Sequence, residues 1–344
     1  MNTPAMVGDV GYVRHDHLNL YLPDRLWLAR SKRGARTDMR WLTYLFASES
    51  GAALLHGLAS GTSMSMQSIP KDRVLALEIH APLPAEQRAI GDALESIDEL
   101  ITALERVVSK KQAVKQGLMQ QLLSGRSRLP GFTCDWTDMR LGDYVSYVKT
   151  VALSRAQLDS SAPLRYLHYG DIHTSPSTAL DAARIAMPRA SAKLAGRAGR
   201  LEVGDLVFAD ASEDPAGVGK SVEITSVPAE GVVPGLHTIA ARFEKSVLAD
   251  GFKAYLQFIP DFREQLLRLA AGTKVLATTK AYISSITLRL PGWKEQSAIA
   301  AALRAADNEM DALQVRLAKL RALKQGMMQQ LLTGRVRLPV EEAA

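Results

Sequence analysis

The stretch EQRAIGDALESIDELITALERVVSKKQAVKQGLMQQLLSGRSRLP, residues 86–130, returns at residues 295–339 as EQSAIAAALRAADNEMDALQVRLAKLRALKQGMMQQLLTGRVRLP. The copies align without gaps, agree at 24 of 45 positions, and agree at 13 of 16 positions where 115–130 meets 324–339. An internal repeat restricts the architecture more than any other feature, because both copies must form the same element. The repeat predicts approximate two-fold symmetry and one surface presented twice.

Each copy has the seven-residue periodicity of a coiled-coil helix. The first copy carries the series Ile90, Ile97, Leu104, Lys111, Leu118 and Leu94, Ile101, Val108, Lys115, Leu122. The second carries Ile299, Ala306, Leu313, Leu320, Met327 and Leu303, Met310, Leu317, Lys324, Leu331. A helix from about 85 to 124 is roughly 60 Å long at 1.5 Å per residue, and it cannot bury its own apolar stripe. We therefore expect the two copies to pack antiparallel as a two-helix rod.

Proline and glycine mark the ends of both predicted helices. Pro84 and Pro291 stand before the helix starts, and Gly125 and Gly334 follow the helix ends. Glycine at that place favours the left-handed residue that closes a helix.

Polar residues of the repeat argue for more than packing. Lys111, Lys115 and Lys324 interrupt the apolar stripe, and we expect them to weaken the seam and to reach past its edge. Two core helices of one bundle are the alternative interpretation, but core packing asks only for apolar residues of suitable size. Here polar positions match as well: Gln116, Gln120, Gln121, Arg126 and Arg128 recur as Gln325, Gln329, Gln330, Arg335 and Arg337.

The segment 131–291 reads as one α+β domain. Short β-type runs bounded by Gly, Asp and Pro lie at LGDYVSYVK, RYLHYGDI, GDLVFAD, SVEIT and HTIAARF. Residues 252–271 read as helical, and YISSITLRL at 282–290 reads as a last strand.

Residues 1–83 resemble the back half of the same domain at an offset of 211. Val7-Gly8 then matches Val218-Gly219, Tyr44-Leu45 matches Tyr255-Leu256, and 11 of 56 positions agree. Roughly 80 residues of a first domain have no counterpart, so we expect the chain to begin in mid-domain. The predicted parts are a partial first domain (1–83), a first helix with connector (84–130), a second domain (131–291), a second helix (292–339) and a tail (340–344).

Composition is that of an ordinary globular protein. Among 344 residues, 47% are hydrophobic and 23% charged, and the net charge of +6 permits contact with DNA without requiring it. The single cysteine, Cys134, allows no intrachain disulfide, and the start MNTPAMVGDV has no secretory pattern. We expect a cytoplasmic protein without a membrane span.

The chain resembles the specificity subunit of type I restriction-modification systems. Each module runs from a Gly-Thr pair (Gly61-Thr62, Gly272-Thr273) through a Pro to Glu-Gln (Glu86-Gln87, Glu295-Gln296) at the start of the long helix, which closes with KQGLMQQLLSGRSRLP or KQGMMQQLLTGRVRLP. Trp136, Leu141-Gly142-Asp143 and Asp171-Ile172 look like landmarks of a target-recognition domain. The missing front half of the first domain departs from the family pattern.

This resemblance implies a non-catalytic, DNA-reading subunit. Two target-recognition domains, the first one partial here, would each read half of an interrupted target in double-stranded DNA. The helices would space them and dock two methylation subunits, which carry the S-adenosylmethionine and through which restriction subunits join. The matched Gln and Arg positions named above are the expected partner contacts. The alternative is a shortened assembly protein of the same descent without full specific reading.

Candidate DNA contacts are polar and basic residues of loops, since such side chains contact phosphates and base edges. In the second domain they are Thr273, Lys274, Thr278, Thr279 and Lys280, with Lys149, Arg189, Lys193, Arg197 and Arg200 as further basic candidates. In the first domain they are Thr62, Ser63, Gln67 and Lys71.

Signals for an enzyme or a metal site are weak. Residues 214–221 (DPAGVGKS) resemble a phosphate-binding loop, but Asp214 stands where that loop needs Gly. His15 and His17, and His168 and His173, lack a second His/Cys pair at zinc-like spacing. We expect neither a catalytic residue nor a metal or cofactor in this chain.

Overall fold

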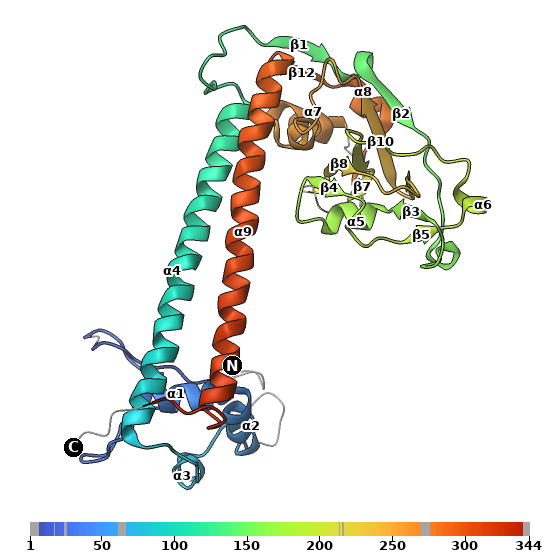
Figure 1. Ribbon diagram of the computed structural model, residues 1–344. Coiled ribbons are helices and arrows are strands. Elements are labelled where there is room, and N and C mark those ends of the chain that lie inside the picture. The colour runs from blue at the N-terminus through green and yellow to red at the C-terminus, as the bar shows by residue number, and fades with distance from the viewer. Residues whose placement is uncertain are drawn as a thin grey trace. The chain divides into compact units, whose positions relative to one another are not determined.

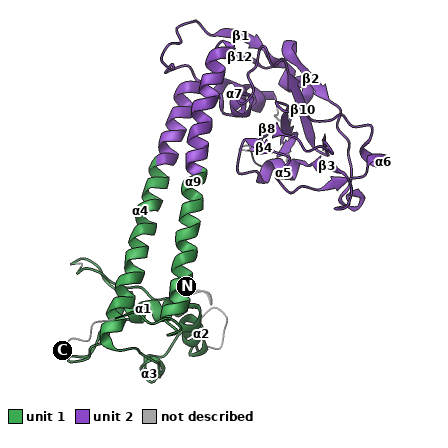
Figure 2. Cartoon of the chain, in the orientation of Figure 1, with its two compact units in different colours: residues 1–110, 311–344 green, residues 111–310 purple. Residues whose placement is uncertain are grey.

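The computed structural model describes residues 7–16, 18–23, 26–60, 67–212, 214, 217–269 and 276–339. The chain forms two compact units (Figure 2). Unit 1 comprises residues 1–110 and 311–344, and unit 2 comprises residues 111–310. The long helices α4 (Pro84–Leu123) and α9 (Trp293–Leu331) each contribute one end to each unit (Figure 1).

In unit 1, short helices pack on the start of α4 and the end of α9. They are α1 (Met39–Ala47), α2 (Glu49–Gly57) and α3 (Lys71–Leu75). Asp38 and Ser48 cap α1 and α2 by accepting hydrogen bonds from backbone N–H groups of the first turn. The core of the unit consists of Trp41, Ile90, Leu94 and Leu331, all buried.

Unit 2 is built on a five-stranded sheet in the order β2-β10-β6-β8-β4. The strands are β2 (Val145–Val148), β10 (Thr238–Phe243), β6 (Leu206–Ala209), β8 (Ser221–Ser226) and β4 (Ala179–Asp181). All neighbours pair antiparallel except β4 with β8. A three-stranded sheet has the order β5-β3-β9, formed by β5 (Arg189–Ala190), β3 (Leu164–Leu167) and β9 (Val232–Pro234).

Two further strand pairs complete unit 2: β1 (Thr137–Arg140) with β12 (Thr287–Leu290), and β7 (Ala211–Ser212) with β11 (Leu276–Ala277). The helical elements are η2 (Leu141–Tyr144), η3 (Arg155–Gln157), α5 (Tyr169–Thr174), α6 (Ala192–Ala195), η5 (Lys253–Phe258), α7 (Pro260–Leu269) and α8 (Lys280–Ser285). The largest core joins the end of α4 and the start of α9 to one side of the main sheet, with Leu123, Phe252 and Leu303 fully buried.

The predicted α+β class with two long antiparallel helices is confirmed. Within unit 1, α4 residues of rising number face α9 residues of falling number, as Asp98 with Lys324 and Glu105 with Arg321 show. Of the apolar-series positions in both copies, Lys111 alone is exposed, and the others are buried or half-buried. The expected left-handed glycines are also present, because Gly125 and Gly334 have φ of 70° and 69°. Pro84, expected just before the helix, is its first residue.

The stripe lysines pair with acidic residues across the seam, which the sequence did not predict, and their expected weakening of the seam remains a prediction. Lys111 lies 2.8 Å from Glu309, and Lys324 lies 2.7 Å from Asp98, in each case on the facing helix of the same unit. Lys115 pairs in the same way with Asp307. The lysines therefore fix the register of the two helices by charge.

Two predicted strands are partly helical. The run RYLHYGDI holds β3 and then α5, because the His168 side chain accepts from Gly170 N–H and Asp171 accepts from the backbone N–H of His168. The run YISSITLRL belongs to α8 as far as Ser285 and only then enters β12, since Thr279 caps the helix start.

Candidate nucleic-acid interface and helix docking surfaces

A buried glutamate at the start of each long helix is held by an arginine from beyond the end of the other. In unit 1, Arg337 donates from Nε to Glu86 at 2.6 Å and from its second nitrogen to the other carboxylate oxygen. In unit 2, Arg128 binds Glu295 with the same two-pronged geometry. The ion pair with Arg337 holds the pKa of Glu86 below its usual range. Two-pronged arginine–carboxylate pairs fix orientation as well as distance, so they set where each helix begins against its neighbour.

A tyrosine, an aspartate and a lysine form a second repeated contact. Tyr44 donates to Asp98 at 2.8 Å, and Lys324 approaches the other oxygen of that carboxylate at 2.7 Å. Tyr255 donates to Asp307 at 2.6 Å, and Lys115 completes the unit 2 set. Burial, with the acceptor aspartate, raises the pKa of both tyrosine hydroxyls above its ordinary value.

The glutamine after each buried glutamate attaches the neighbouring segment to the helix. Gln87 accepts from Asp38 N–H at 3.0 Å and donates to the Pro82 carbonyl at 2.9 Å. Gln296 accepts from Ala249 N–H at 3.0 Å and donates to the Pro291 carbonyl at 2.9 Å. Asp38 and Ala249 are 211 residues apart, so the offset read from the sequence describes a real structural equivalence.

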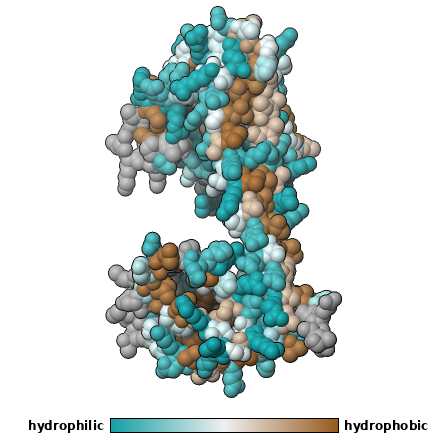
Figure 3. Space-filling view, turned by 90° about the vertical axis from the view of Figure 1, so that its left-hand side faces the viewer, coloured by the Kyte–Doolittle hydropathy of each residue, from teal (hydrophilic) through white to brown (hydrophobic). Residues whose placement is uncertain are grey.

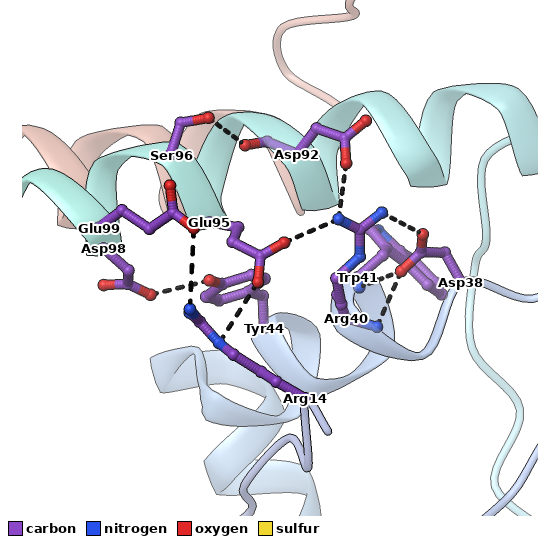
Figure 4. Close-up of polar contacts among 10 residues, drawn as sticks. All are labelled: Arg14, Asp38, Arg40, Trp41, Tyr44, Asp92, Glu95, Ser96, Asp98 and Glu99. Atoms are coloured by element: carbon purple, nitrogen blue, oxygen red, sulfur yellow. Dashed lines mark hydrogen bonds and ion pairs between the residues drawn. The ribbon is translucent and has the colours of Figure 1, made fainter. Parts of the chain in front are cut away.

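In unit 1, further ion pairs join α4 to the residues near Asp38 (Figure 4). Arg40 contacts Asp92 at 2.6 Å and Glu95 at 2.8 Å on α4, and it also binds Asp38. Burial raises the pKa of Asp38, but hydrogen bonds from the Arg40 side chain and from the backbone outweigh it and hold that pKa below its usual value. Arg14 adds an ion pair with Glu95 at 3.3 Å. The face of α4 toward α1 is therefore fixed by several charged contacts.

These contacts explain part of the repeated polar sequence and leave part unexplained. Arg128 and Arg337 serve within the chain. The side chains of the six repeated glutamines, by contrast, are exposed and form no hydrogen bond to any described residue, and Arg126 and Arg335 are exposed as well. The unexplained positions are Gln116, Gln120, Gln121 and Arg126 on unit 2, and Gln325, Gln329, Gln330 and Arg335 on unit 1. Residues that are identical in both copies of the repeat, but whose side chains form no hydrogen bond to a described residue, are suited to bind an external partner.

The predicted DNA loop of unit 2 is described from residue 276 onward. The Thr278 side chain is buried, and its N–H donates to the Asp210 carbonyl at 2.6 Å. Thr279 serves as the cap of α8 and is exposed. Lys280 is exposed, with Nζ 5.5 Å from the ring centroid of Tyr147. Of these three, Thr279 and Lys280 face solvent. Thr273 and Lys274 lie outside the described residues.

The same loop adjoins a polar cluster that the sequence did not single out for DNA contact. His237 has a positive φ of 57° and places its Nδ1 3.1 Å from Asp210. The rings of Tyr169 and His237 form a T-shaped contact at a centroid distance of 5.4 Å. Non-glycine residues at positive φ are uncommon and often lie at functional sites. Sequence gives no sign of this backbone state, which explains why the cluster was missed.

The basic candidates divide into two groups. Lys149 and Arg197 are exposed. The Gly199 N–H donates to the Lys149 carbonyl at 2.8 Å, so Lys149 lies beside the loop that carries Arg197 and Arg200. Arg189 instead lies in β5, 3.7 Å from Glu230, and is committed within the unit. Lys193 is exposed on α6.

The first-domain candidates are only partly described. Thr62 and Ser63 lie outside the described residues, and Gln67 is half-buried. Lys71 is the exposed first residue of α3, just as Lys280 is the first residue of α8. These two lysines are 209 residues apart and occupy equivalent places.

The candidate phosphate-binding loop has the wrong surroundings. Such a loop leads into a helix whose N-terminal amides hold the phosphate. Here Ser221 begins strand β8, and the Lys220 ammonium donates to the His173 carbonyl at 2.6 Å. Among the described residues, no group of three His, Cys, Asp or Glu side chains could hold a metal ion. None of the described helices combines the length and apolar character that a membrane crossing requires.

Several solved structures resemble the chain. The S subunit of the type I restriction-modification system from M. genitalium aligns with a TM-score of 0.55 and 15% identity, over 86% of this chain and 73% of that one. A structure that addresses complex assembly and conformational transition of the type I R-M system aligns with a TM-score of 0.53 and 18% identity, over 88% and 73%. This chain has the S-subunit fold. The HsdS subunit from Thermoanaerobacter tengcongensis also matches over 86% and 70%, with 18% identity and a TM-score of 0.47.

The S-subunit fold agrees with the resemblance drawn from the repeated helix. No protein-family model matches the chain. The likeness to these solved structures therefore lies in the three-dimensional arrangement of the chain.

Proposed function

We infer that the chain is the non-catalytic specificity subunit of a type I restriction-modification complex. It binds double-stranded DNA through recognition domains and docks methylation subunits on its long helices. The chemistry of methyl transfer, with S-adenosylmethionine, belongs to those partners, and restriction subunits join through them. The complex acts on DNA in the cytoplasm.

The observation that carries this proposal is the set of exposed polar residues that both units share. Gln116 and Gln120 match Gln325 and Gln329, yet none of them has an internal role. An S-subunit fold with two like surfaces suits two copies of one partner, since equal surfaces bind equal subunits. DNA reading is supported by the exposed Lys280 of the 276–280 loop and by the exposed Lys149 and Arg197, because phosphate contacts require Lys and Arg.

The docking proposal is tested by co-expression of the full chain with a type I methylation subunit. Combined alanine substitution of Gln116, Gln120, Gln121 and Arg126 is expected to reduce the number of bound methylation subunits from two to one, as size-exclusion chromatography with light scattering would measure. The equivalent substitutions on unit 1 (Gln325, Gln329, Gln330 and Arg335) do the same, and both sets together abolish binding.

Two exposed glutamines of the same helices provide the matched control. Gln112 and Gln314 correspond to Arg321 and Glu105 in the other copy, so they belong to no shared surface. Their alanine variants retain two partners. Retention of both partners by the chain with all eight surface substitutions would refute this docking surface.

DNA reading is tested by salt-dependent binding of duplex DNA to the assembled complex. Lys280→Ala is expected to lower the slope of log affinity against log salt by about 1, because one phosphate contact is lost. Lys294→Ala serves as control, since Lys294 is an exposed cation at the start of α9. A slope unchanged by Lys280→Ala and by a combined Lys149→Ala and Arg197→Ala variant would show that DNA lies elsewhere.

A further inference from the structure

The described residues between 9 and 37 of unit 1 form no helix or strand, are exposed, and include many apolar side chains. Tyr12, Leu20, Tyr21, Leu22 and Leu28 expose between 44% and 82% of their surface. Among the described residues, backbone hydrogen bonds within the segment are local turns, such as Leu26 N–H to the Pro23 carbonyl. The face of unit 1 in Figure 3 shows apolar surface between polar residues. An apolar run of this length in contact with water calls for a specific reason.

The exposed segment has an equivalent in unit 2, with matching contacts at both of its ends. At one end, Gly8 has φ of 89° and lies against Leu55, as Gly219 has φ of 73° and lies against Leu266. At the other end, Asp38 N–H binds Gln87 as Ala249 N–H binds Gln296. Both ends correspond at the same offset of 211, so the chain between them has equal length in the two units.

The offset assigns a strand identity to each part of the exposed segment. Residues 10–15 correspond to β8, residues 21–23 to β9, and residues 27–32 to β10. In unit 2 these strands are almost entirely buried. Pro23 corresponds to Pro234, the last residue of β9. The exposed segment therefore carries the sequence positions of three core strands.

The neighbours of those strands in unit 2 come from one earlier stretch of chain. β10 pairs with β2 and β6, β8 pairs with β6 and β4, and β9 pairs with β3. All four neighbours lie between residues 145 and 209. The described residues of unit 1 hold no counterpart of any of them. Residues 78–81 correspond to β12, and they too pair with no counterpart of β1 among the residues of unit 1 that the structure describes.

We propose that residues 10–15, 21–23 and 27–32 form an acceptor edge for a polypeptide segment that folds like residues 137–209 of this chain. The segment comes from outside these 344 residues, since residues 137–209 are already paired within unit 2. A folded second copy cannot supply it for the same reason. The segment contributes strands equivalent to β2, β3, β4 and β6, and backbone hydrogen bonds and apolar burial hold it.

The first test needs only the full chain. Leu28→Ser is expected to leave the stability of unit 1 unchanged, whereas Ile239→Ser, its counterpart in β10, destabilises unit 2. Amide hydrogen exchange in α1 and α7 reports the two units separately. A large loss of protection in α1 on Leu28→Ser, or protection of amides 10–15 that rises with protein concentration, would show that the edge is already covered and would overturn the proposal.

The second test supplies the missing strands within one chain. A hybrid with a second copy of residues 131–217 directly before Val7 reproduces the connection found in unit 2, where residue 217 precedes Val218. Amides of 10–15 and 27–32 are expected to exchange at least ~100-fold more slowly in the hybrid than in the parent chain, because strand pairing protects them. The matched control carries Val207→Pro in the added copy only and is expected to exchange like the parent.

A disulfide test fixes the register of the added strand. In unit 2, Ala240 lies directly opposite Val207. Ala29→Cys with Val207→Cys in the added copy, in a background where each Cys134 is Ser, is expected to cross-link on oxidation, and Ala29→Cys with Ser191→Cys is not. If the added residues remain unprotected and uncross-linked while α1 stays protected, unit 1 has failed to organise them and the proposal is wrong.

Discussion

In units 1 and 2 the same contacts hold the flanking segments to the long helices. The units differ in the pairing of the chain that lies between those contacts. Glu86 with Arg337, Asp98 with Lys324 and Gln87 with Asp38 recur in unit 2 at the equivalent positions. The strands that fill the interval in unit 2 are unpaired in the described part of unit 1. Attachment to the helices and completion of the sheet are therefore separable properties of this fold.

The largest expected difference is in proteolysis. Arg33 is exposed in the unpaired segment, whereas Arg242 lies in β10 and binds Asp205. We expect trypsin to cut after Arg33 at least ~100-fold faster than after Arg242, because cleavage needs locally open chain. Mass spectrometry of a brief digest measures both rates. Equal rates would remove the contrast between the units.

The next effect concerns the aromatic residue that anchors each unit to α4 or α9. Trp41 and Phe252 occupy equivalent positions and are both buried. Each alanine substitution is expected to cost about 3–5 kcal/mol, mainly by leaving a cavity. The loss should be confined to the substituted unit, as residue-resolved hydrogen exchange would show. A loss that spreads equally over both units would mean that they do not fold separately.

A smaller effect is expected at the tyrosine–aspartate contacts. Tyr44→Phe and Tyr255→Phe each remove one hydrogen bond to a charged acceptor and should cost about 1.5–3 kcal/mol. Double-mutant cycles with Lys324→Met and Lys115→Met measure the coupling within each set. Coupling in one unit and none in the other would break the equivalence of the two sets.

The smallest effect is the acid sensitivity of Glu86. Its pKa in the folded chain lies below the ordinary 4.5, so the Arg337 contact stabilises the fold above that pH and is lost as the pH falls through the folded value. Urea unfolding between pH 5 and about pH 3 should show a steeper loss in the parent than in Arg337→Gln. Identical pH profiles for the two proteins would deny Glu86 this role.

The sequence predicted the helices well because their signals are long and periodic. The seven-residue series located the buried faces, and Gly125 and Gly334 marked the ends. The offset of 211 in the sequence predicted the equivalence of the flanking segments, which the contacts of Gln87 and Gln296 confirm. Charge pairing at Lys115 and Lys324 escaped prediction, since the facing residue of an antiparallel pair is set by a register that periodicity alone leaves open.

The recognition surface was harder to predict. Helices α5 and α8 have six residues each, too few for periodicity, and their starts depend on caps by His168 and Thr279. Thr278 is a polar loop residue in the sequence but is buried in the fold. His237 is distinguished by its positive φ and by its contact with Asp210, which lies 27 positions away in the sequence. Such features arise from tertiary packing and have no local sequence signature.

Selection from a random duplex DNA pool, with this chain bound to methylation subunits, tests the central claim most directly. The account predicts enrichment of one specific half-site, read by unit 2. Substitution of His237 and Lys280 to alanine should abolish it, and substitution of Gln67 and Lys71 in unit 1 should leave it unchanged. Enrichment of two half-sites, or of none, would contradict the account.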